Sequence, residues 1–493
     1  MTLGQLFERS GLSPAPAGDA HDMAVTGVVC DSRVVKTGDL FIAVRGEHFD
    51  GTTFAGDART RGAVAVVAQD VQPPNFDAPW IQVEDVRATM AVLAAAFHGA
   101  PSHELLVVGT TGTNGKTTTT YLIEAILEAA GITCGRITSV SYRVGRDEQS
   151  AGRTTPESPH LQAMMRTMID AGCRGCVMEV SSHALDLRRA DAIRFSVAVF
   201  TNLTRDHLDF HGDMARYFAA KRQLFEMLPD TSPAVINVDD RYGRELSAIV
   251  ARPVTYAINT GADVRPKRLK LSLSGMEMDV RTARGLLHLR SALLGRINAY
   301  NVLAAVATGV SLSLSFRAIE EGVAAVERVP GRLEVVSRAA DDISVLVDFA
   351  HTDDALRGLL ETVRPLARGR LITVFGCGGD RDTTKRSLMG TVAGRLSDLV
   401  VLTSDNPRSE DPVAIVNDIQ LGLTGSDTPW STVIDREEAV THAIRDARPG
   451  DLVVVAGKGH ERYQVVGSRS FPFEDVAVAR VALGQRRTRS RVG

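Results

Sequence analysis

Short apolar runs recur along the chain, and stretches with helical spacing of apolar residues separate most of them. In the middle of the chain these runs lie at residues 175–180, 196–200, 234–238 and 254–256. Each run has the length of a buried strand. Strands that alternate with helices predict a mostly parallel sheet covered on both faces, and ligands bind such a sheet at the carboxyl ends of its strands.

The other apolar runs divide the chain into three parts. Residues 1–100 combine short strand-like runs with an amphipathic helix at 87–98, which predicts a small α/β unit. Residues 101–332 contain the central sheet and a polar, β-rich stretch at 267–289. Residues 333–493 predict a second parallel sheet, because four buried runs there are each followed by a polar or glycine-rich loop. The predicted fold class is therefore α/β.

One glycine-rich stretch has the context of a phosphate-binding loop. Gly109-Thr-Thr-Gly-Thr-Asn-Gly-Lys-Thr-Thr118 follows an apolar run and precedes a helical pattern. Its glycines allow backbone N–H groups to surround phosphate oxygens, Lys116 would reach the β- and γ-phosphates, and Thr117 would hold Mg²⁺. Thr110 departs from the usual pattern, which has glycine there. A glycine-rich turn with an incidental Lys-Thr pair is the alternative, and the strand–loop–helix context argues against it.

Polar side chains after the neighbouring runs suggest a metal site beside this loop. Glu179 ends an apolar run, where an unpaired buried carboxylate is costly, so beside ATP it is most simply a Mg²⁺ ligand. His207 follows the next run and could be a second ligand, although imidazole is unusual for Mg²⁺. Lys221 lies on a predicted helix soon after. A satisfied core histidine and a surface lysine are the alternatives.

The last part of the chain presents charged residues in loops after its predicted strands. Arginine binds a carboxylate through two parallel hydrogen bonds, and acidic side chains pair with an ammonium group. Two arginines and two acids there could therefore bind a zwitterion together. These four residues are Arg386, Asp405, Arg408 and Glu461. Solvated charges on surface loops are the alternative.

Composition excludes several classes of protein. A hydrophobic fraction of 44% and a charged fraction of 23% are typical of a soluble globular protein. The net charge of -3 gives no reason to expect nucleic acid or an anionic membrane as a partner. No apolar run reaches the roughly 20 residues of a spanning helix, and the N-terminus lacks the pattern of a signal peptide. We therefore expect a cytoplasmic protein.

The cysteines and the C-terminal arginines suggest no further site. Five cysteines are few for this length and odd in number, so a disulfide framework is not expected. Cys173 and Cys176 lack a second pair at zinc spacing, and we interpret both as small buried hydrophobic residues. The arginines between 486 and 491 are interpreted as a solvated, frayed tail.

Together these stretches resemble the Mur ligases, the ATP-dependent amide-forming enzymes of peptidoglycan synthesis. The resemblance covers nearly the whole chain, and Thr110 is normal in this family. Besides the phosphate loop, the residues that carry it are 179–183, 202–212, 221, 295–301, 330–332, 348–356 and 457–464. The resemblance implies a three-domain architecture. The domains are a small UDP-binding α/β domain at 1–100, a central P-loop ATPase-like domain with a mostly parallel sheet at 101–332 and a Rossmann-like amino-acid-binding domain at 333–493.

The resemblance also implies ATP and Mg²⁺ as cofactors and assigns residues to them. Lys221 matches the family's carbamylated lysine, and a carbamate would replace a cation that repels Mg²⁺ by a bridging anion. The expected catalytic residues are Lys116, Glu179, His207 and Lys221. The expected metal ligands are Thr117, Glu179, His207 and the carbamate of Lys221. The expected ATP-binding residues are Gly112, Thr113, Asn114, Gly115, Lys116, Thr117, Thr118, Asn298, Arg332 and Asp348.

Within the family, Thr154-Thr-Pro-Glu157 and Asp405-Asn-Pro-Arg408 resemble the members that add meso-diaminopimelate to UDP-N-acetylmuramoyl-L-alanyl-D-glutamate. Arg408 would bind the second carboxylate of that amino acid, which lysine lacks. The residues expected to bind the amino acid are Arg386, Asp405, Asn406, Pro407, Arg408, Gly457 and Glu461. The residues expected to bind the UDP-muramoyl-dipeptide are Cys30, Ser32, Glu47, His48, Phe49, Thr154, Thr155, Ser182 and Arg189.

The chain departs from the family pattern near the ATP and amino-acid loops. Phe349 replaces the usual tyrosine, Asp353 and Ser387 each replace a proline, and Thr383-Thr384 replaces the common Arg/Lys-Gly pair. A paralogue that joins a different amino acid is therefore one alternative. The partners expected on either reading are small-molecule substrates, namely ATP, the UDP-muramoyl-dipeptide and an amino acid, bound by a monomer that closes about a hinge near residues 330–334.

Two further alternatives stand on the same residues. A folylpolyglutamate synthetase-like enzyme is disfavoured, because those enzymes lack a unit comparable to residues 1–100. A nucleotide-binding regulatory protein that has lost catalysis is disfavoured by the intact set of Lys116, Glu179, His207 and Lys221.

Overall fold

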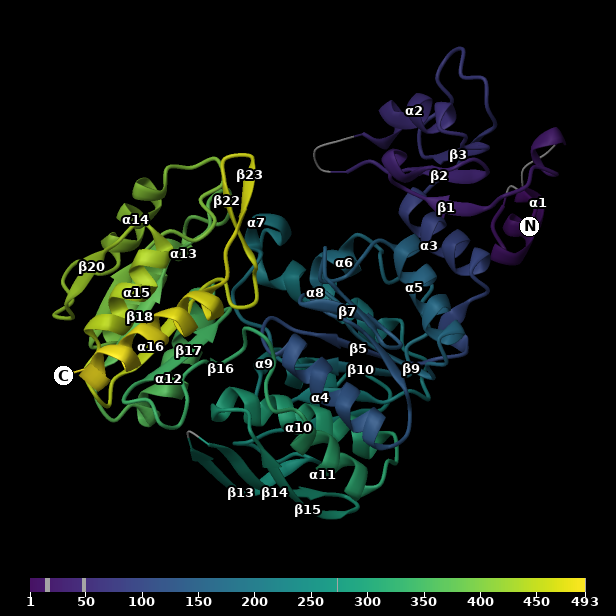
Figure 1. The fold of residues 1–493 in the computed structure, drawn as a ribbon. Helices are drawn as coiled ribbons and strands as arrows, with labels where there is room; N and C mark the ends of the chain where they lie inside the picture. The colour runs from purple at the N-terminus through teal and green to yellow at the C-terminus, as the bar shows by residue number, and fades with distance from the viewer. Residues whose placement is uncertain (14–17, 47–49, 273, 493) are drawn as a thin grey trace.

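The computed structural model describes residues 1–13, 18–46, 50–272 and 274–492 and arranges them as three α/β parts (Figure 1). A four-stranded, an eight-stranded and a six-stranded sheet form the centres of these parts. The predicted α/β class is confirmed. Across the described ranges, no helix is both long and apolar enough to cross a membrane.

The first part is a parallel sheet whose strands follow chain order. Its strands are β1 (Gly27–Val29), β2 (Asp39–Ala43), β3 (Ala65–Ala68) and β4 (Trp80–Gln82). Its helices are α1 (Leu3–Ser10), α2 (Ala55–Thr60) and α3 (Val86–Phe97). Helices α1 and α3 cover one face of the sheet and α2 covers the other, so every residue of β2 is buried. The predicted small α/β unit is confirmed.

The central sheet places the phosphate loop at its middle. The strand order is β12-β11-β10-β5-β9-β6-β7-β8, and β5 lies between β10 and β9. These strands are β5 (Leu106–Thr111), β6 (Cys134–Ile137), β7 (Ser141–Val144), β8 (Asp147–Ser150), β9 (Gly175–Glu179), β10 (Val197–Phe200), β11 (Ala234–Asn237) and β12 (Pro253–Tyr256). All pairs are parallel except those of β7 with β6 and with β8.

Helices cover both faces of the central sheet. They are α4 (Lys116–Ala129), α5 (Ser158–Asp170), α6 (Ser182–Asp186), α7 (Leu208–His211), α8 (Met214–Glu226), α9 (Arg241–Ser247), α10 (Gly295–Ser311) and α11 (Phe316–Ala325). One core joins the sheet to α4, α10 and α11, and the other joins it to α5, α6, α8 and α9. The polar β-rich stretch is an antiparallel sheet of β13 (Arg265–Ser272), β14 (Gly275–Thr282) and β15 (Gly285–Ser291). Figure 1 shows it under α10 and α11.

The last part is a six-stranded sheet in the order β16-β17-β21-β18-β19-β20, parallel except at β16. Its strands are β16 (Glu334–Val335), β17 (Ser344–Asp348), β18 (Leu371–Phe375), β19 (Leu399–Leu402), β20 (Trp430–Thr432) and β21 (Leu452–Ala456), followed by a hairpin of β22 (Tyr463–Val466) and β23 (Arg469–Pro472). Its helices are α12 (Asp353–Val363), α13 (Lys385–Leu396), α14 (Pro412–Leu421), α15 (Arg436–Asp446) and α16 (Asp475–Val492). The first three cover one face and the last two cover the other.

The C-terminal segment corrects one prediction. Residues 475–492 form the helix α16 and not a frayed tail. Arg486 pairs with Asp342 at 2.6 Å and Arg487 pairs with Asp341 at 2.6 Å, so two of the arginines hold the helix against the turn before β17. By contrast, the interpretation of Cys173 and Cys176 is confirmed, because both are buried and free. The domain boundaries near 100 and 332 stay a prediction.

Candidate functional site

The phosphate loop requires glycine at two positions. Gly112 has φ 144° and Gly115 has φ 88°, backbone angles that residues with a side chain rarely adopt. A Cβ atom at Gly112 would lie 1.9 Å from Thr201 Oγ1, and one at Gly115 would lie 2.3 Å from Asn301 Oδ1. Thr110, in contrast, belongs to β5 and pairs with a residue of β9, so glycine is not needed there. The part of the loop that requires glycine therefore begins at Gly112, two residues after Thr110.

Two lysine side chains converge on one carbonyl oxygen of this loop. Lys116 Nζ donates to Gly112 O and Thr113 O, both at 2.9 Å. Lys221, on α8, is 1% exposed, and its Nζ donates to the same Gly112 O at 2.8 Å. Burial lowers the pKa of both ammonium groups, and the charge of Lys116 lowers the pKa of Lys221 further. The structure thus brings both predicted lysines to the loop.

The end of β9 and the start of α4 meet at one carboxylate. Thr117 Oγ1 donates to Glu179 Oε1 at 2.8 Å, and the amide of Ser139 donates to the same oxygen at 2.9 Å. Arg332 NH2 donates to Thr117 Oγ1 at 3.2 Å. Sequence analysis missed Ser139, because β6, which precedes it, carries no long apolar run. The only local signal is the polar Thr138-Ser139 pair after a short strand.

His207 lies in the loop between β10 and α7, close to other titratable groups. Its φ of 54° places it in the left-handed region, and its Nε2 is 3.3 Å from Asp206 Oδ2. Burial lowers the pKa of His207, and the charges of His183, Lys221 and Lys116 lower it further against the pull of Asp206. The imidazole is therefore neutral near neutral pH, which is the form that can bind a metal.

The predicted metal ligands are an unusual donor set. Among the residues that the structure describes, no three His, Cys, Asp or Glu side chains gather as a candidate metal cluster. The predicted set contains only two such residues, Glu179 and His207. Thr117 would add a hydroxyl, and Lys221 could add oxygens only as a carbamate. The donor types suit a hard cation once Lys221 is modified, because each would then offer oxygen apart from one imidazole.

Asn298, Arg332 and Asp348 come from segments outside the phosphate loop. Asn301 Nδ2 donates to Asn298 Oδ1 at 3.0 Å, and Thr119 Oγ1 donates to Asn301 Oδ1 at 3.3 Å, so Asn298 is linked through Asn301 to the first turn of α4. Asp348 accepts the amide of Leu333 at 2.7 Å, and burial raises the pKa of its carboxyl. The guanidinium of Arg332 lies 4.4 Å from the centre of the Phe349 ring.

The loops after β19 and β21 join in the last part of the chain. Asn406 Nδ2 donates to Glu461 Oε2 at 2.8 Å. Gly457 has φ 114°, and a Cβ atom there would lie 2.6 Å from Asp405 Oδ2. Arg408, which follows Pro407, donates through NH1 to Gly379 O at 2.6 Å and has φ 51°. The structure therefore brings six predicted residues to one edge of this sheet.

Arg386 lies in a different network from the other predicted residues. Its side chain is buried on α13, where NH1 donates to Asp418 Oδ2 at 2.9 Å and NH2 donates to both oxygens of Glu410. Its terminal nitrogens are thus already occupied by carboxylates. A direct contact of Arg386 with an amino-acid substrate would require Glu410 or Asp418 to move.

Three of the residues expected to hold the UDP-muramoyl-dipeptide make contacts within the central part. Thr155 Oγ1 donates to Glu179 O at 2.9 Å, and Arg189 Nε is 2.9 Å from Glu157 Oε1. Ser182 Oγ is 3.0 Å from His211 Nε2. The remaining expected residues are Cys30 and Ser32 after β1, Thr154 in the loop before α5, and Glu47, His48 and Phe49, which lie outside the described residues.

Burial, with the nearby Glu157 carboxylate, raises the pKa of the Cys30 thiol to about 12. Cys30 is therefore an uncharged thiol next to the central part.

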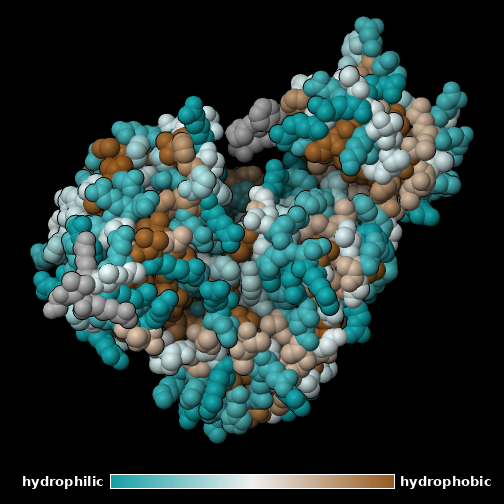
Figure 2. Space-filling model, in the orientation of Figure 1, coloured by the Kyte–Doolittle hydropathy of each residue, from teal (hydrophilic) through white to brown (hydrophobic). Residues whose placement is uncertain are grey.

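Figure 2 shows the molecule hollowed between its first and last parts, above the central sheet.

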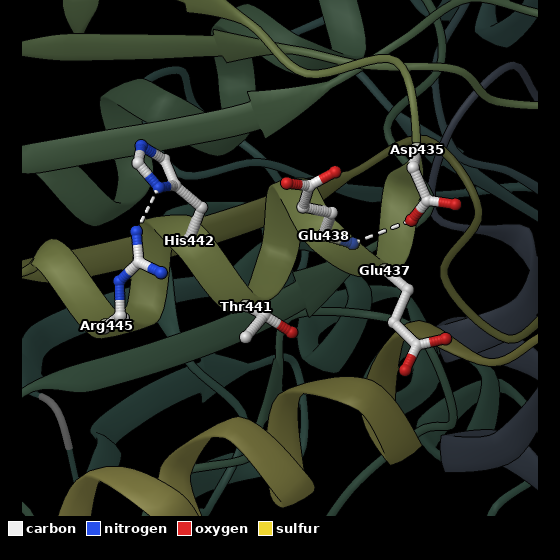
Figure 3. A pocket seen from close by; sticks show the side chains of 6 residues that line it. All are labelled: Asp435, Glu437, Glu438, Thr441, His442 and Arg445. Atoms are coloured by element: carbon white, nitrogen blue, oxygen red, sulfur yellow. Dashed lines mark hydrogen bonds between the residues drawn. The ribbon is translucent and has the colours of Figure 1, made fainter.

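A separate surface hollow lies on the outer side of α15 (Figure 3). It has a volume of about 330 Å³ and is lined by Asp435, Glu437, Glu438, Thr441, His442 and Arg445. Glu438 N donates to Asp435 Oδ1 at 2.8 Å, and Arg445 NH2 is 2.7 Å from His442 Nδ1. None of the lining residues belongs to the predicted site, so this hollow is not part of it.

Three family models match the chain in order. They are the Mur ligase family, catalytic domain at residues 24–98, the Mur ligase middle domain at 110–309 and the Mur ligase, glutamate ligase domain at 331–459. Among curated proteins, a UDP-N-acetylmuramoyl-L-alanyl-D-glutamate–2,6-diaminopimelate ligase of Geobacter metallireducens is 49% identical, covering 94% of this chain and 95% of the relative. One of Solibacter usitatus with the same name is 47% identical and covers 98% of both chains. The chain belongs to the Mur ligase family.

A solved structure agrees with this assignment over the full length of this Mur ligase. The structure of a UDP-N-acetylmuramoyl-L-alanyl-D-glutamate–2,6-diaminopimelate ligase is 32% identical, has a TM-score of 0.70 and covers 99% of this chain and 100% of its own. The predicted three-domain architecture of the Mur ligases is thereby confirmed. The individual site residues are not tested by these likenesses and stay predictions.

Two residues at which this Mur ligase departs from the family pattern, Asp353 and Thr384, lie close to the side chain of Arg205. Arg205, in the loop after β10, is 3.2 Å from Asp382 Oδ2 and 3.2 Å from Thr384 Oγ1. Asp353, at the start of α12, lies 4.0 Å from the same guanidinium. Sequence analysis did not single out Arg205, because its partners follow it by more than 140 residues and only the fold brings them together.

Proposed function

We propose that this Mur ligase adds meso-diaminopimelate to UDP-N-acetylmuramoyl-L-alanyl-D-glutamate with consumption of ATP. The observation that carries the proposal is the joined loop pair after β19 and β21, where Glu461 and Asn406 are in contact and Arg408 lies on the same edge. An ammonium and a carboxylate at the far end of one amino acid would find an acid and an arginine there. The names of relatives 47% and 49% identical support the same substrate.

The proposed reaction has two steps. The γ-carboxylate of the terminal D-glutamate attacks the γ-phosphorus of ATP, which forms an acyl phosphate and releases ADP. The amine of diaminopimelate then attacks the acyl carbon and loses a proton, and the tetrahedral intermediate collapses to the amide and phosphate. Stabilising the charge of the transferred phosphoryl group is the main catalytic task in such reactions. Lys116, the first residue of α4, would do this.

Mg²⁺ fits the donor set described above. Thr117, Glu179, His207 and a carbamate of Lys221 would hold it, and the ion would neutralise phosphate charge. The lowered pKa of Lys221 supports the modification, because a neutral amine is the form that adds to CO₂. Gly112, Gly115 and Arg332 would border the nucleotide. We infer that the enzyme works on small molecules as a cytoplasmic monomer.

The main alternative is a paralogue that joins another amino acid, because Phe349, Asp353 and Ser387 depart from the family pattern. An amino-acid screen with UDP-muramoyl-dipeptide, ATP and a phosphate-release readout separates the two. We expect release with meso-diaminopimelate and little with L-lysine. Release only with a different amine would favour the paralogue, and no release with any amine would favour a non-catalytic protein.

The role of the phosphate loop has its own test. The Lys116→Ala variant should lose acyl-phosphate formation by roughly 100-fold or more, since it removes a charge that stabilises the transferred phosphoryl group. Hydroxylamine traps the acyl phosphate as a hydroxamate, which measures this step without an amino acid. Lys270→Met, an exposed charge removal on β13, is the matched control. Full ligation by Lys116→Ala would refute the assignment of the loop.

A further inference from the structure

The loop after β21 contains one fully buried lysine that has no assigned role. Lys458, the residue after Gly457, is 0% exposed. Its Nζ donates to Asn406 Oδ1 and to Glu461 Oε2, both at 2.9 Å. Burying a charge is costly unless it is paired and hydrogen-bonded, so the carboxylate of Glu461 and the amide of Asn406 together keep this cation in place.

Lys458 fixes the orientation of the Asn406 amide. Asn406 Oδ1 accepts from Lys458 Nζ and from the backbone amide of Val465 at 3.0 Å, while its Nδ2 donates to Glu461 Oε2. Two donors facing one end of the amide identify that end as the oxygen. Turning the amide over would place its NH₂ group against an ammonium and an N–H. The NH₂ group of Asn406 therefore stays on the side of Glu461.

Lys458 also leaves Glu461 with one free oxygen. Both hydrogen bonds that Glu461 accepts within the described residues end on Oε2, from Lys458 and Asn406. Its side chain is 20% exposed, so Oε1 can reach a ligand. A carboxylate held in this way offers a single directed acceptor for an ammonium group.

The charges around this carboxylate balance. Arg436 is fully buried, pairs with Asp475 at 2.8 Å and lies 3.9 Å from Asp405. Burial raises the pKa of the Tyr463 hydroxyl, the charges of Glu461 and Asp405 raise it further and the charge of Arg408 lowers it, so those three charges act on one group. Counting the charged residues in these contacts, the cluster has three anions and three cations. The anions are Asp405, Glu461 and Asp475, and the cations are Arg408, Arg436 and Lys458.

We propose that Lys458 is a specificity-determining positioning residue: its buried charge keeps the amino-acid pocket neutral, so that the pocket prefers a side chain ending in a zwitterion over one ending in an ammonium alone. The inference rests on the proposed function. A neutral pocket with separated charges matches an ammonium plus a carboxylate, whereas a side chain with only an ammonium adds an unbalanced charge. Without Lys458 the pocket carries one excess negative charge and suits lysine better.

The experiment compares substrates in matched variants of the full-length protein. The kcat/KM values for meso-diaminopimelate and for L-lysine are measured for the wild type, Lys458→Met, Lys458→Arg and the control Lys270→Met. Hydroxamate trapping in each reports the first half-reaction, which needs no amino-acid substrate. For Lys458→Met we expect the ratio of diaminopimelate to lysine kcat/KM to fall by about 10-fold or more, mainly through KM, with hydroxamate formation retained. Lys458→Arg should keep the ratio within a few-fold, because the charge remains.

The outcomes separate the inference from the proposed function. An equal fall for both substrates, with the ratio unchanged, would show that Lys458 only supports the fold and would overturn the inference. A wild-type protein that forms no hydroxamate would instead overturn the proposed function. If Lys458→Met does not fold, Lys458→Gln carries the same prediction, because glutamine keeps a donor to Asn406 but removes the charge.

Discussion

At the scale of single residues, the most consequential contact is the pair of lysines on Gly112 O. Both donate to that oxygen, and like charges this close in a buried place disfavour one another. Lys221 is the more confined of the two, and its pKa is lowered first by burial and then by Lys116. The neutral form is therefore favoured more for Lys221 than for Lys116, and a neutral amine can attack CO₂ with release of a proton to form a carbamate.

This predicts a carbamate that can be seen directly. With ¹³C-labelled bicarbonate, the wild type should show a carbamate carbon resonance that is absent from Lys221→Met and present in Lys270→Met. The resonance should weaken as the pH falls below the lowered pKa of Lys221, because the protonated amine has no free electron pair. A resonance that survives in Lys221→Met would contradict the assignment.

At the scale of elements, the contacts of Arg205 connect two sheets. Arg205 extends from the loop after β10 and reaches Asp382 and Thr384, which precede α13. The loop after β10 also carries His207, and the loop before α13 follows β18 of the other sheet. The contact therefore links the nucleotide side of the site to the amino-acid side. Its members are partly exposed, so its contribution to global stability is small.

We expect Arg205→Ala to lower kcat for ligation by roughly five-fold while leaving Tm nearly unchanged, because partly exposed ion pairs contribute only about 1 kcal/mol. The reason is that the closed arrangement of the two loops is less populated. High salt should lower the wild-type kcat towards that of the variant, since salt screens the pair. Arg216→Ala, on the exposed side of α8, is the control. A variant with unchanged kcat at low salt would exclude a role in closure.

Local patterns predicted the strands and the loops that end them, because apolar runs and glycines act within a few residues. The phosphate loop, Glu179 and Lys221 were placed correctly near each other for this reason. The pairing of Lys458 with Asn406 was not predictable, because it depends on the order β17-β21-β18-β19 of the last sheet. The same holds for Arg386, whose partner Asp418 lies on α14, and for α16, whose arginines find acids far earlier in the chain.

At the scale of the whole molecule, His460 joins the last part to the central part. Its Nε2 donates to Ser139 O at 3.1 Å, the same Ser139 whose amide binds Glu179. The backbone here is tightly packed, since a Cβ atom at Gly331 would lie 2.1 Å from His460 N. Burial, together with the charge of Arg332, lowers the pKa of His460 to about 3.

This predicts a pH dependence of stability. The unfolded chain binds a proton at His460 below about pH 6.5, whereas the folded protein does so only near pH 3. The free energy of unfolding is therefore unaffected by this group above about pH 6.5 and falls progressively as the pH is lowered towards 3. This group contributes a slope of up to about 1.4 kcal/mol per pH unit. Urea unfolding between about pH 7 and about pH 5 should give a shallower slope for His460→Gln than for the wild type.

The His442→Gln variant, at a partly exposed position on α15, is the control. Equal slopes for His460→Gln and the wild type would show that the imidazole is not held neutral at this contact.

Each of the three large sheets takes its strands from one uninterrupted stretch of the chain. During synthesis on the ribosome, the first sheet can therefore be completed before β5 has been made, and the central sheet before β17 emerges. The composite site behaves differently, since it needs Gly457 to Glu461 near the end of the chain. A nascent chain can thus hold two finished sheets and still lack the amino-acid loops, so catalytic competence is among the last properties that the growing polypeptide acquires.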